Sequence, residues 1–462
     1  MLVWNKKTVA VAAADSVDPR AWRAEFEVAF GQVAARFARR DARGAARDLL
    51  AGLVAPLERK NCWTIAEHSG HETPHRLQHL LGRAVWDADA VRNDVRDYVI
   101  ARLADPDAVL VVDETGDLKK GSATVGVQRQ YSGTAGRIEN CQVAVFLTYA
   151  AGRGHAFIDR RLYLPESWAS DPDRRTEAGV PHDATFATKP HLAADMITDA
   201  LAAGTPARWV AGDEVYGADP HLRATCRRLG LSYVLAIGCN RAVPTGAGPL
   251  RADKATGLLP DGARARMSCG DGSKGRRWYS WAVVELEPEP DGPDQLGQQG
   301  SGHHALLVRR NDTTGELAWY RCWTPRPVAI IDLVRVAGRR WTVEENFQAA
   351  KSHAGLDEHQ VRRWNSWHRW TTLAMLAHAF LTILAMTMND TAPDHDSGGL
   401  VPITLGEARR LFTALTATAS RTVERVLAWS RWRRRHQHRA RRAHYQRREG
   451  SITAAHRPDL RL

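Results

Sequence analysis

The stretch Ala108-Val-Leu-Val-Val-Asp-Glu-Thr-Gly-Asp-Leu-Lys-Lys-Gly121 decides how the rest of the chain is interpreted. Val109 to Val112 is a continuous aliphatic run, which is typical of a strand buried on both faces. The run ends on Asp113, and Thr115-Gly116 is expected to begin a turn. A carboxylate at the end of a buried strand is held rigidly, so Asp113 is a candidate functional residue. The alternative is an aspartate that only caps a turn.

A second aspartate follows the same pattern further along the chain. Arg208-Trp-Val-Ala-Gly-Asp-Glu-Val-Tyr-Gly217 is a short apolar strand that ends on Asp213 and a glycine turn. A helix at 220–229 and a strand at 231–237 come next, and this strand–helix–strand order predicts parallel pairing. Strands at 143–149 and 155–164 are expected to form an antiparallel meander with the strand at 109–112.

A third carboxylate lies on a predicted helix, Arg339-Arg-Trp-Thr-Val-Glu-Glu-Asn-Phe-Gln-Ala-Ala-Lys351. Thr342 is expected to cap this helix, with Glu345 three residues later completing a capping box. Apolar residues at 343, 347 and 350 predict the face that packs on the core. Glu344 and Lys351 share the adjacent face, which selects Glu344 for chemistry. On an ordinary surface helix, such charges would form ion pairs worth about a few tenths of a kcal/mol.

Two strand-end aspartates and one helix-borne glutamate are hard oxygen ligands, which suit Mg²⁺ or Mn²⁺. Two such ions can activate a water or a 3′-hydroxyl and stabilise the leaving oxygen of a phosphoryl displacement. Lys351 would orient phosphates beside the metals, and so would Arg340 if the helix begins early enough to place it one turn before Glu344.

Positive charge is concentrated near one end of the chain. The 462 residues carry a formal net charge of +12. Residues 401–462 contain 15 Arg and four acidic residues, so this segment holds nearly the whole surplus. Nine arginines between 431 and 448 are interleaved with Trp, Tyr and His, which predicts a cationic helix that contacts nucleic-acid phosphates. The expected DNA contacts are Arg433, Arg434, Arg435, Arg441 and Arg442. The alternative is a solvated basic tail without a specific partner.

Cysteine usage and hydropathy indicate a cytoplasmic protein. The six cysteines lie far apart and form no C-x-x-C pair, which fits reduced thiols better than disulfides or a zinc site. The N-terminus lacks a signal-peptide pattern, and no run of about 18 or more apolar residues is present. The longest apolar stretch, 373–386, is interrupted by His378 and is too short to cross a bilayer.

The pattern changes along the chain predict five segments. Residues 1–105 form a helical, DNA-binding domain, in which a short helix at 62–70 and a second one from Pro74 resemble a helix-turn-helix. Residues 106–239 and 327–390 form two parts of a catalytic core. Between them, 240–326 is a β-rich insertion with a disordered loop near 287–302. A strand at 328–336 returns to the main sheet, and 391–462 is a basic helical region.

Three motifs together resemble a known family. They are Asp113-Glu-Thr-Gly with Lys119-Lys-Gly121, Gly212-Asp-Glu-Val-Tyr-Gly217, and Arg340-Trp-Thr-Val-Glu-Glu-x-Phe-x-x-Ala-Lys351. They resemble the DDE transposases of bacterial insertion sequences, in the branch with the signature Tyr-x2-Arg-x3-Glu-x6-Lys. The resemblance implies an α/β fold with a ribonuclease-H-like mixed sheet, flanking helices and a β-rich insertion before the glutamate. It implies cut-and-paste transposition of double-stranded element ends into target DNA by a homodimer, in the bacterial cytoplasm at the nucleoid, without a membrane partner.

The resemblance also assigns roles residue by residue. Asp113, Asp213 and Glu344 become the ligands of two Mg²⁺ or Mn²⁺ ions. The implied phosphate contacts are Arg340, Lys351, Lys119 and Lys120. The signature tyrosine would fall at position 337, which is alanine in this chain. The hairpin intermediate of this branch is therefore a weaker expectation than nicking. Trp341 could stack on an unpaired base or belong to the core, and the core interpretation is favoured.

Two other functions remain open from the sequence. A transposase-derived DNA-binding or regulatory protein would need no catalysis, but all three carboxylates are present. A structure-selective nuclease of the same fold, without strand transfer, is hardly separable from a transposase by sequence.

Overall fold

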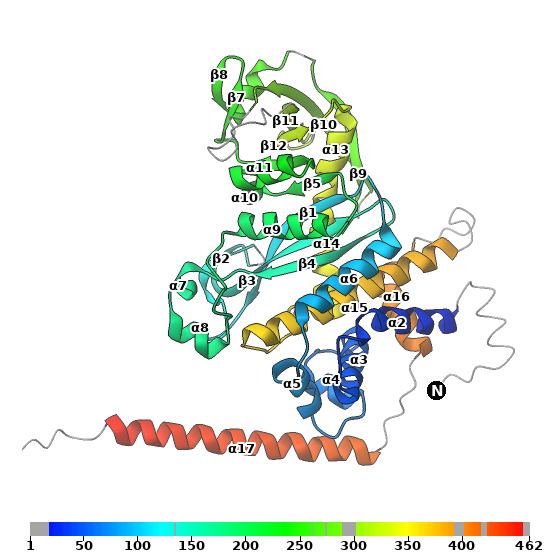
Figure 1. Cartoon of the computed structure of the whole chain (residues 1–462), viewed down its shortest axis with the longest axis vertical. Helices are drawn as coiled ribbons and strands as arrows, with labels where there is room; N and C mark the ends of the chain where they lie inside the picture. The colour runs from blue at the N-terminus through cyan, green and yellow to red at the C-terminus, as the bar shows by residue number, and fades with distance from the viewer. Residues whose placement is uncertain are drawn as a thin grey trace, which may run out of the picture.

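A computed structural model of the chain describes residues 18–133, 135–260, 262–272, 275–288, 302–391, 402–416 and 423–455. A large mixed sheet runs through the molecule, with helices on both of its faces and a helical region at one end (Figure 1). The strand order is β2-β3-β1-β5-β6-β12-β11-β10-β9, and β4 also pairs with β3. The fold is therefore a mixed α/β arrangement, as the sequence predicts.

The first half of the sheet combines antiparallel and parallel pairs. It contains β1 (Val109–Leu118), β2 (Gln128–Ser132), β3 (Arg137–Ala150), β4 (His155–Leu162), β5 (Trp209–Gly212) and β6 (Ser232–Ile237). β3 pairs antiparallel with β1, β2 and β4, whereas β1, β5 and β6 are parallel to one another. The predicted meander and the predicted parallel pairing are both confirmed.

The β-rich residues after β6 extend the same sheet. They form β9 (Ala265–Gly272), β10 (Gly275–Leu286), β11 (His303–Arg310) and β12 (Leu317–Thr324), and β12 pairs antiparallel with β6. β7 (Ala242–Thr245) and β8 (Gly248–Arg251) make a separate hairpin, followed by α12 (Ala252–Ala255) and a 3₁₀ turn at Thr256–Leu258. The loop predicted near 287–302 lies almost wholly outside the described residues, which resume at 302.

Helices cover the two faces of the first half of the sheet. α9 (Lys189–Ala202) packs on one face, and α14 (Trp341–Ala354) packs on the other (Figure 1). Side chains of β1 alternate between these faces: Asp113 and Thr115 face α14, and Glu114 faces α9. Short helices α7 (Glu166–Ala169), α8 (Pro172–Ala178), α10 (Glu214–Gly217) and α11 (Pro220–Arg228) complete this half.

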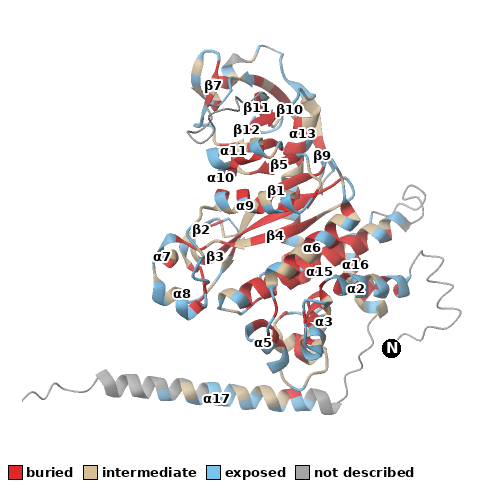
Figure 2. Cartoon of the chain, in the orientation of Figure 1, coloured by how far each residue is buried: buried red, intermediate tan, exposed pale blue. Residues whose placement is uncertain are grey.

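The helical region is built around α15 (Trp364–Thr391), which is almost entirely buried (Figure 2). It packs against α2 (Pro19–Ala34), α3 (Arg40–Val54), α5 (His75–Gly82), α6 (Ala88–Leu103) and α16 (Leu405–Thr416). α15 is longer than the apolar stretch in the sequence indicated, and by length and composition alone it could cross a membrane. However, 89% of its most apolar window is buried within the protein, which is the environment of a core helix.

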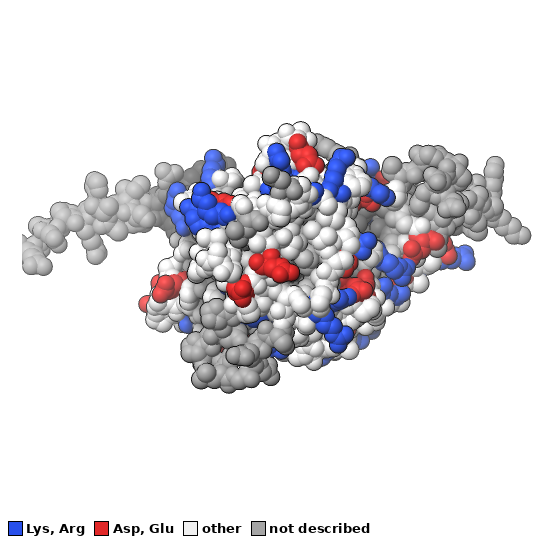
Figure 3. Space-filling model, turned by 90° about the horizontal axis from the view of Figure 1, so that it is seen from above, with Lys and Arg blue, Asp and Glu red and all other residues white. Residues whose placement is uncertain are grey.

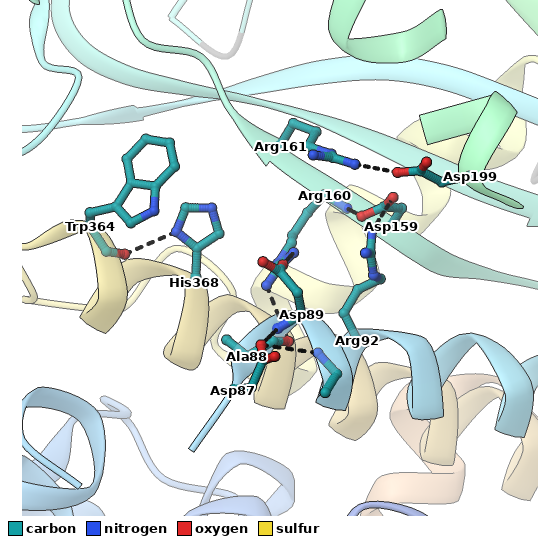
Figure 4. Close-up of polar contacts among 11 residues, drawn as sticks. Asp87, Ala88, Asp89, Arg92, Asp159, Arg160, Arg161, Asp199, Trp364 and His368 are labelled. Carbon is teal, nitrogen blue, oxygen red and sulfur yellow. Dashed lines mark hydrogen bonds and ion pairs between the residues drawn. The ribbon is translucent and has the colours of Figure 1, made fainter. Parts of the chain in front are cut away.

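A buried group of charges joins β4 to α6 (Figure 4). Arg92 of α6 pairs with Asp159, and the Arg160 guanidinium donates a hydrogen bond to Asp89 at 2.7 Å. Asp159 and Arg160 are 2% and 1% exposed. Because a buried charge is stable only when it is paired, these contacts fix the sheet against α6.

Two predicted elements differ from the structure. β1 does not end at Asp113 but continues to Leu118, because β3 pairs with it along its whole length, so Thr115-Gly116 is not a turn. Residues 328–336 do not form a strand. From residue 330 onward they instead belong to α13 (Ile330–Arg339), which packs against β9. Its buried positions 333, 334, 336 and 337 follow helical spacing.

Candidate active site

Asp113 and Asp213 lie side by side because of the register of two parallel strands. Val112 of β1 is aligned with Gly212 of β5, and the next residue of each strand is the aspartate. Asp113 accepts a hydrogen bond from the backbone N–H of Glu114 at 2.8 Å. Asp213 caps α10 by accepting one from the N–H of Val215 at 2.9 Å. The site is therefore at the edge of the parallel ladder, although β1 itself continues past it.

Two glycines of the second motif allow the backbone to pass close to its neighbours. A Cβ at Gly212 would lie 2.9 Å from the side chain of Val112. A Cβ at Gly217 would lie 1.8 Å from the backbone oxygen of Ala236, which no side chain tolerates. These close approaches hold β5 and α10 against β1 and β6, and so they fix Asp213.

Glu344 is brought to the aspartates by α14 and Arg340. The Arg340 guanidinium lies 3.0 Å from the Glu344 carboxylate and 3.9 Å from that of Asp113. Arg340 has helical backbone angles and directly joins α13 to α14, so it occupies the position one turn before Glu344 that the sequence left conditional. The predicted apolar stripe at 343, 347 and 350 is buried.

The prediction of a capping box at the start of this helix is wrong. Because α13 leads into α14 with only Arg340 between them, the start of α14 has no side-chain cap. The Thr342 hydroxyl donates back to the carbonyl of Arg339 at 2.8 Å. Glu345 lies 3.3 Å from His155, and this contact holds the pKa of Glu345 below its usual range.

The carboxylates of the site disfavour one another's charge. Burial raises the pKa of Asp113 to about 8, and the charges of Asp213 and Glu114 add to this shift. Burial, with a contribution from Glu114, also raises the pKa of Asp213. The pKa of Glu344 is raised by burial and by Asp213, against the effect of Arg340. A site with this much unfavourable negative charge attracts a cation.

A hydrogen-bonded group on the other face of β1 has no signal in the local sequence. Glu114 accepts from the Lys189 ammonium at 2.7 Å and from the Tyr216 hydroxyl at 2.6 Å. Tyr216 belongs to the second motif, but Lys189 is 75 residues from Glu114 in sequence. No local pattern connects such residues, and only the packing of α9 against the sheet does.

The predicted phosphate-binding lysines lie along the same end of β1. The Lys351 ammonium donates to the Thr115 hydroxyl at 2.7 Å, and Lys119 is 3.5 Å from the carbonyl of His359. Burial lowers the pKa of Lys119. Lys120 is exposed. His359 is buried and contacts Asp117 at 3.1 Å, so a second acid–base pair lies beyond the carboxylates.

Two further residues of the third motif are placed clearly. Trp341 is 47% exposed, so the favoured core interpretation is wrong, and its ring is accessible to solvent. Ala337 is buried in α13, where its methyl group can make no hydrogen bond to a phosphate.

The donors present fit a hard divalent cation in kind. All three are carboxylates, and burial raises the pKa of each despite the opposing charge of Arg340. Within the described ranges, however, no three potential ligands are close enough together to hold an ion. Arg340 contacts two of the carboxylates and supplies the positive charge between them, so coordination requires this guanidinium to move aside.

The predicted DNA-binding elements also meet one another. α4 (Cys62–His68) and α5 form the expected helix pair, and α4 begins with a capping box made by Asn61 and Thr64. The basic segment forms α17 (Val423–Ala455), which packs against α4 through Trp432 and Arg433 and against the turn after α4 through Trp429.

Comparison with known proteins gives a consistent family. The sequence profile described as "DDE superfamily endonuclease" matches residues 32–284, more than half of the chain. A stretch of 194 residues is 31% identical to a probable transposase for insertion sequence element IS701 of Microchaete diplosiphon. That stretch covers 42% of this chain and 48% of the relative, so the match spans about half of the relative's length.

Solved structures resemble the chain only distantly. A piggyBac transposase synaptic complex with hairpin DNA aligns over 82% of this chain and 71% of its own, at 13% identity and a TM-score of 0.43. The NurA nuclease of Sulfolobus solfataricus aligns over 59% of this chain and 86% of its own, at 10% identity and a TM-score of 0.26. The family assignment therefore depends on the sequence profile, which covers the motifs of Asp113 and Asp213: the chain belongs to the DDE superfamily endonucleases.

Proposed function

We propose that this protein is a DDE transposase, which cleaves DNA at the ends of an insertion sequence and joins the freed ends to a target. The observation that carries the proposal is the strand register that sets Asp113 beside Asp213, with Glu344 linked to Asp113 through Arg340. Membership of the endonuclease family and the similarity to an insertion-sequence transposase support it. Support for a ribonuclease-H-like core comes from the order β4-β3-β1-β5-β6.

Asp113, Asp213 and Glu344 would hold Mg²⁺ or Mn²⁺, in two sites. When bound, the ions would activate the attacking water or 3′-hydroxyl and stabilise the leaving oxygen. Arg340, released from the carboxylates, is then free to pair with a phosphate. Lys351, Lys119 and the exposed Lys120 would hold the scissile strand along β1, and Trp341 offers an exposed ring to an unpaired base.

The remaining parts of the proposal concern the DNA and the assembly. We assign end recognition to the helices of 1–105, and phosphate contacts to the basic region 391–462, including Arg434, Arg435, Arg441 and Arg442. Arg433, the remaining predicted contact, is instead paired with Glu67 of α4. We assign residues 106–239 and 327–390 to the two parts of the catalytic core, and residues 240–326 to the strands inserted between them. Joining two element ends calls for a homodimer on double-stranded DNA, in the bacterial cytoplasm at the nucleoid.

The test is Mg²⁺-dependent cleavage of a duplex that carries the element's own ends. Wild type is compared with Asp113→Ala and Glu344→Gln, and with Glu345→Gln as a matched control on the same helix. We expect nicking at the end boundary in wild type and in Glu345→Gln, and loss of at least about 100-fold in the other two. DNA binding should persist in all four proteins.

Wild-type protein that binds the duplex but cleaves nothing under Mg²⁺ or Mn²⁺ would contradict the proposal. It would favour the transposase-derived regulatory protein. Cleavage without any joining of the 3′ end to a target duplex would favour the structure-selective nuclease.

A further inference from the structure

The cationic helix α17 has one face that is fully engaged by the N-terminal helices. Trp429 is 2% exposed, and its indole N–H donates to the carbonyl of His71 at 2.6 Å. The ring of Trp432 lies 4.7 Å from that of Trp63 in α4, and His436 stacks on Trp432. These α17 residues, with Arg433, are spaced by three, one and three positions, which is a single helical face. We call the contact the tryptophan cluster: Trp63, Trp429, Trp432 and His436.

An ion pair extends the tryptophan cluster toward α4. Arg433 lies 2.5 Å from Glu67, whose side chain is 20% exposed. His75, at the start of α5, is within 6.1 Å of the Trp432 ring. α17 is therefore held against α4 and against the turn that leads into α5, the second helix of the predicted helix-turn-helix.

The opposite face of α17 is cationic and open. Its side chains surround a shallow depression of 610 Å³, and they are Arg431, Arg434, Arg435, His438 and Arg439. All five are exposed, and residues 425–448 contain no Asp or Glu. Around the end of the molecule seen in Figure 3, by contrast, acidic and basic side chains are interspersed.

A rigid path connects this unit to the candidate active site. Lys60, just before α4, is 1% exposed, and its ammonium donates to the carbonyl of His353 near the end of α14 at 2.5 Å. The backbone N–H of Lys60 donates to Glu358 at 2.5 Å. α14 is the helix that carries Glu344, so α17 is positioned relative to that carboxylate through packed helices.

We propose that α4, the turn before α5 and α17 form one DNA-binding unit, in which the tryptophan cluster fixes α17 so that a duplex lies along its arginine face. The proposal deepens the transposase function proposed above and depends on it for the identity of the polyanion. From Arg431 to Arg442 the helix extends for about 16 Å. A duplex of that length carries roughly ten phosphate charges, which is a suitable partner for an uninterrupted arginine face.

The arrangement argues against a membrane surface as the partner. A helix that lies in a membrane interface needs an accessible apolar face opposite its basic one. In α17 that face contains Trp429 and Trp432, and α4 and the turn after it already cover these two rings. Between Arg431 and Arg439 the exposed face is formed by four arginines and His438, which offer contacts to phosphates.

The test measures binding of the full chain to a 30-base-pair duplex of arbitrary sequence by fluorescence anisotropy, at several NaCl concentrations. Arg434→Gln with Arg435→Gln should reduce the slope of log K against log salt by about 1.8, since each phosphate contact contributes about 0.9. The matched control, Arg264→Gln with Arg310→Gln, removes two exposed charges from β-rich residues and should leave the slope unchanged.

Trp432→Ala tests the tryptophan cluster separately from charge. It removes no positive charge, so the salt slope should stay the same, while affinity falls about tenfold because α17 must be ordered on binding. His436→Ala is a milder variant that should give a smaller loss in the same direction. Unfolding curves of both variants show whether the protein remains folded.

An unchanged slope in the arginine variant would overturn the proposal, and so would unchanged affinity in both Trp432→Ala and His436→Ala. The proposal would also be overturned if the arginine variant lost binding to phosphatidylserine vesicles but bound the duplex as wild type does. Cleavage of element ends by the same proteins distinguishes failure of this proposal from failure of the proposed transposase function. If wild type cleaves but the arginine variant keeps its slope, only this proposal fails. If the slope responds and wild type never cleaves, only the transposase function fails.

Discussion

Replacing Asp113 with Asn should make the metal-free protein more stable. The side chain is 15% exposed, and burial together with nearby carboxylates raises its pKa to about 8. Asn has nearly the same shape as the neutral acid and cannot ionise. The substitution therefore removes the cost of holding a carboxyl group where its charge is disfavoured.

The sign of the effect follows from the two pKa values. In the unfolded chain Asp113 ionises near pH 3.8, whereas in the folded protein it keeps its proton until about pH 8. Stability from this group is thus fully present below pH 3.8 and is lost as pH rises toward 8, at up to about 1.4 kcal/mol per pH unit. The upper limit at pH 8 is about 5–6 kcal/mol. Allowing for relaxation of the site, we expect Asp113→Asn to gain about 2–3 kcal/mol at pH 8 and below about 1 kcal/mol at pH 5.

Urea unfolding followed by tryptophan fluorescence, in EDTA at pH 5, 6.5 and 8, measures this gain. Asp195→Asn on the exposed side of α9 is the matched control and should show no gain at any pH. Mg²⁺ at about 100 times its Kd should stabilise wild type by about 2.7 kcal/mol and the variant by less. A variant no more stable than wild type at pH 8, or a gain that grows toward acid, would refute the electrostatic account of the site.

Three further predictions concern the packing that supports the site. Asp159→Asn leaves buried arginine charge uncompensated and should cost about 3 kcal/mol or more in urea unfolding, whereas Asp199→Asn, at an exposed ion pair, should cost less than about 1 kcal/mol. Similar losses for both would contradict the burial argument. Gly217→Ala forces a Cβ onto a backbone carbonyl and should lower stability by about 1–3 kcal/mol, while Gly31→Ala, in an open helix position, should raise it by up to about 1 kcal/mol. Glu114→Gln removes the salt bridge between β1 and α9, so it should reduce the rate of cleavage more than the affinity for DNA. Equal kcat values for the variant and wild type would show that this salt bridge does not support the active site.

The sequence alone determined the three motifs and most of the elements that carry them. The aliphatic run before Asp113, the glycine-bounded strand before Asp213 and the apolar stripe beside Glu344 depend on local periodicity, which a single sequence displays. The positive charge of α17 is likewise evident from the arginine content of that segment.

Tertiary structure alone decided where the elements end and what the side chains contact. β1 continues past Asp113 because β3 supplies hydrogen-bond partners from a distant segment, and 330–336 is helical because it packs on β9. Arg340 reaches two carboxylates, and Lys189 reaches Glu114, only after the sheet and its helices are assembled. The position of α17 also depends on the assembled fold, because its tryptophans contact residues more than 350 positions earlier in the chain. Local sequence sets the conformation of a segment, but such long-range contacts are made by the assembled fold, because their free energy comes from burial shared between segments.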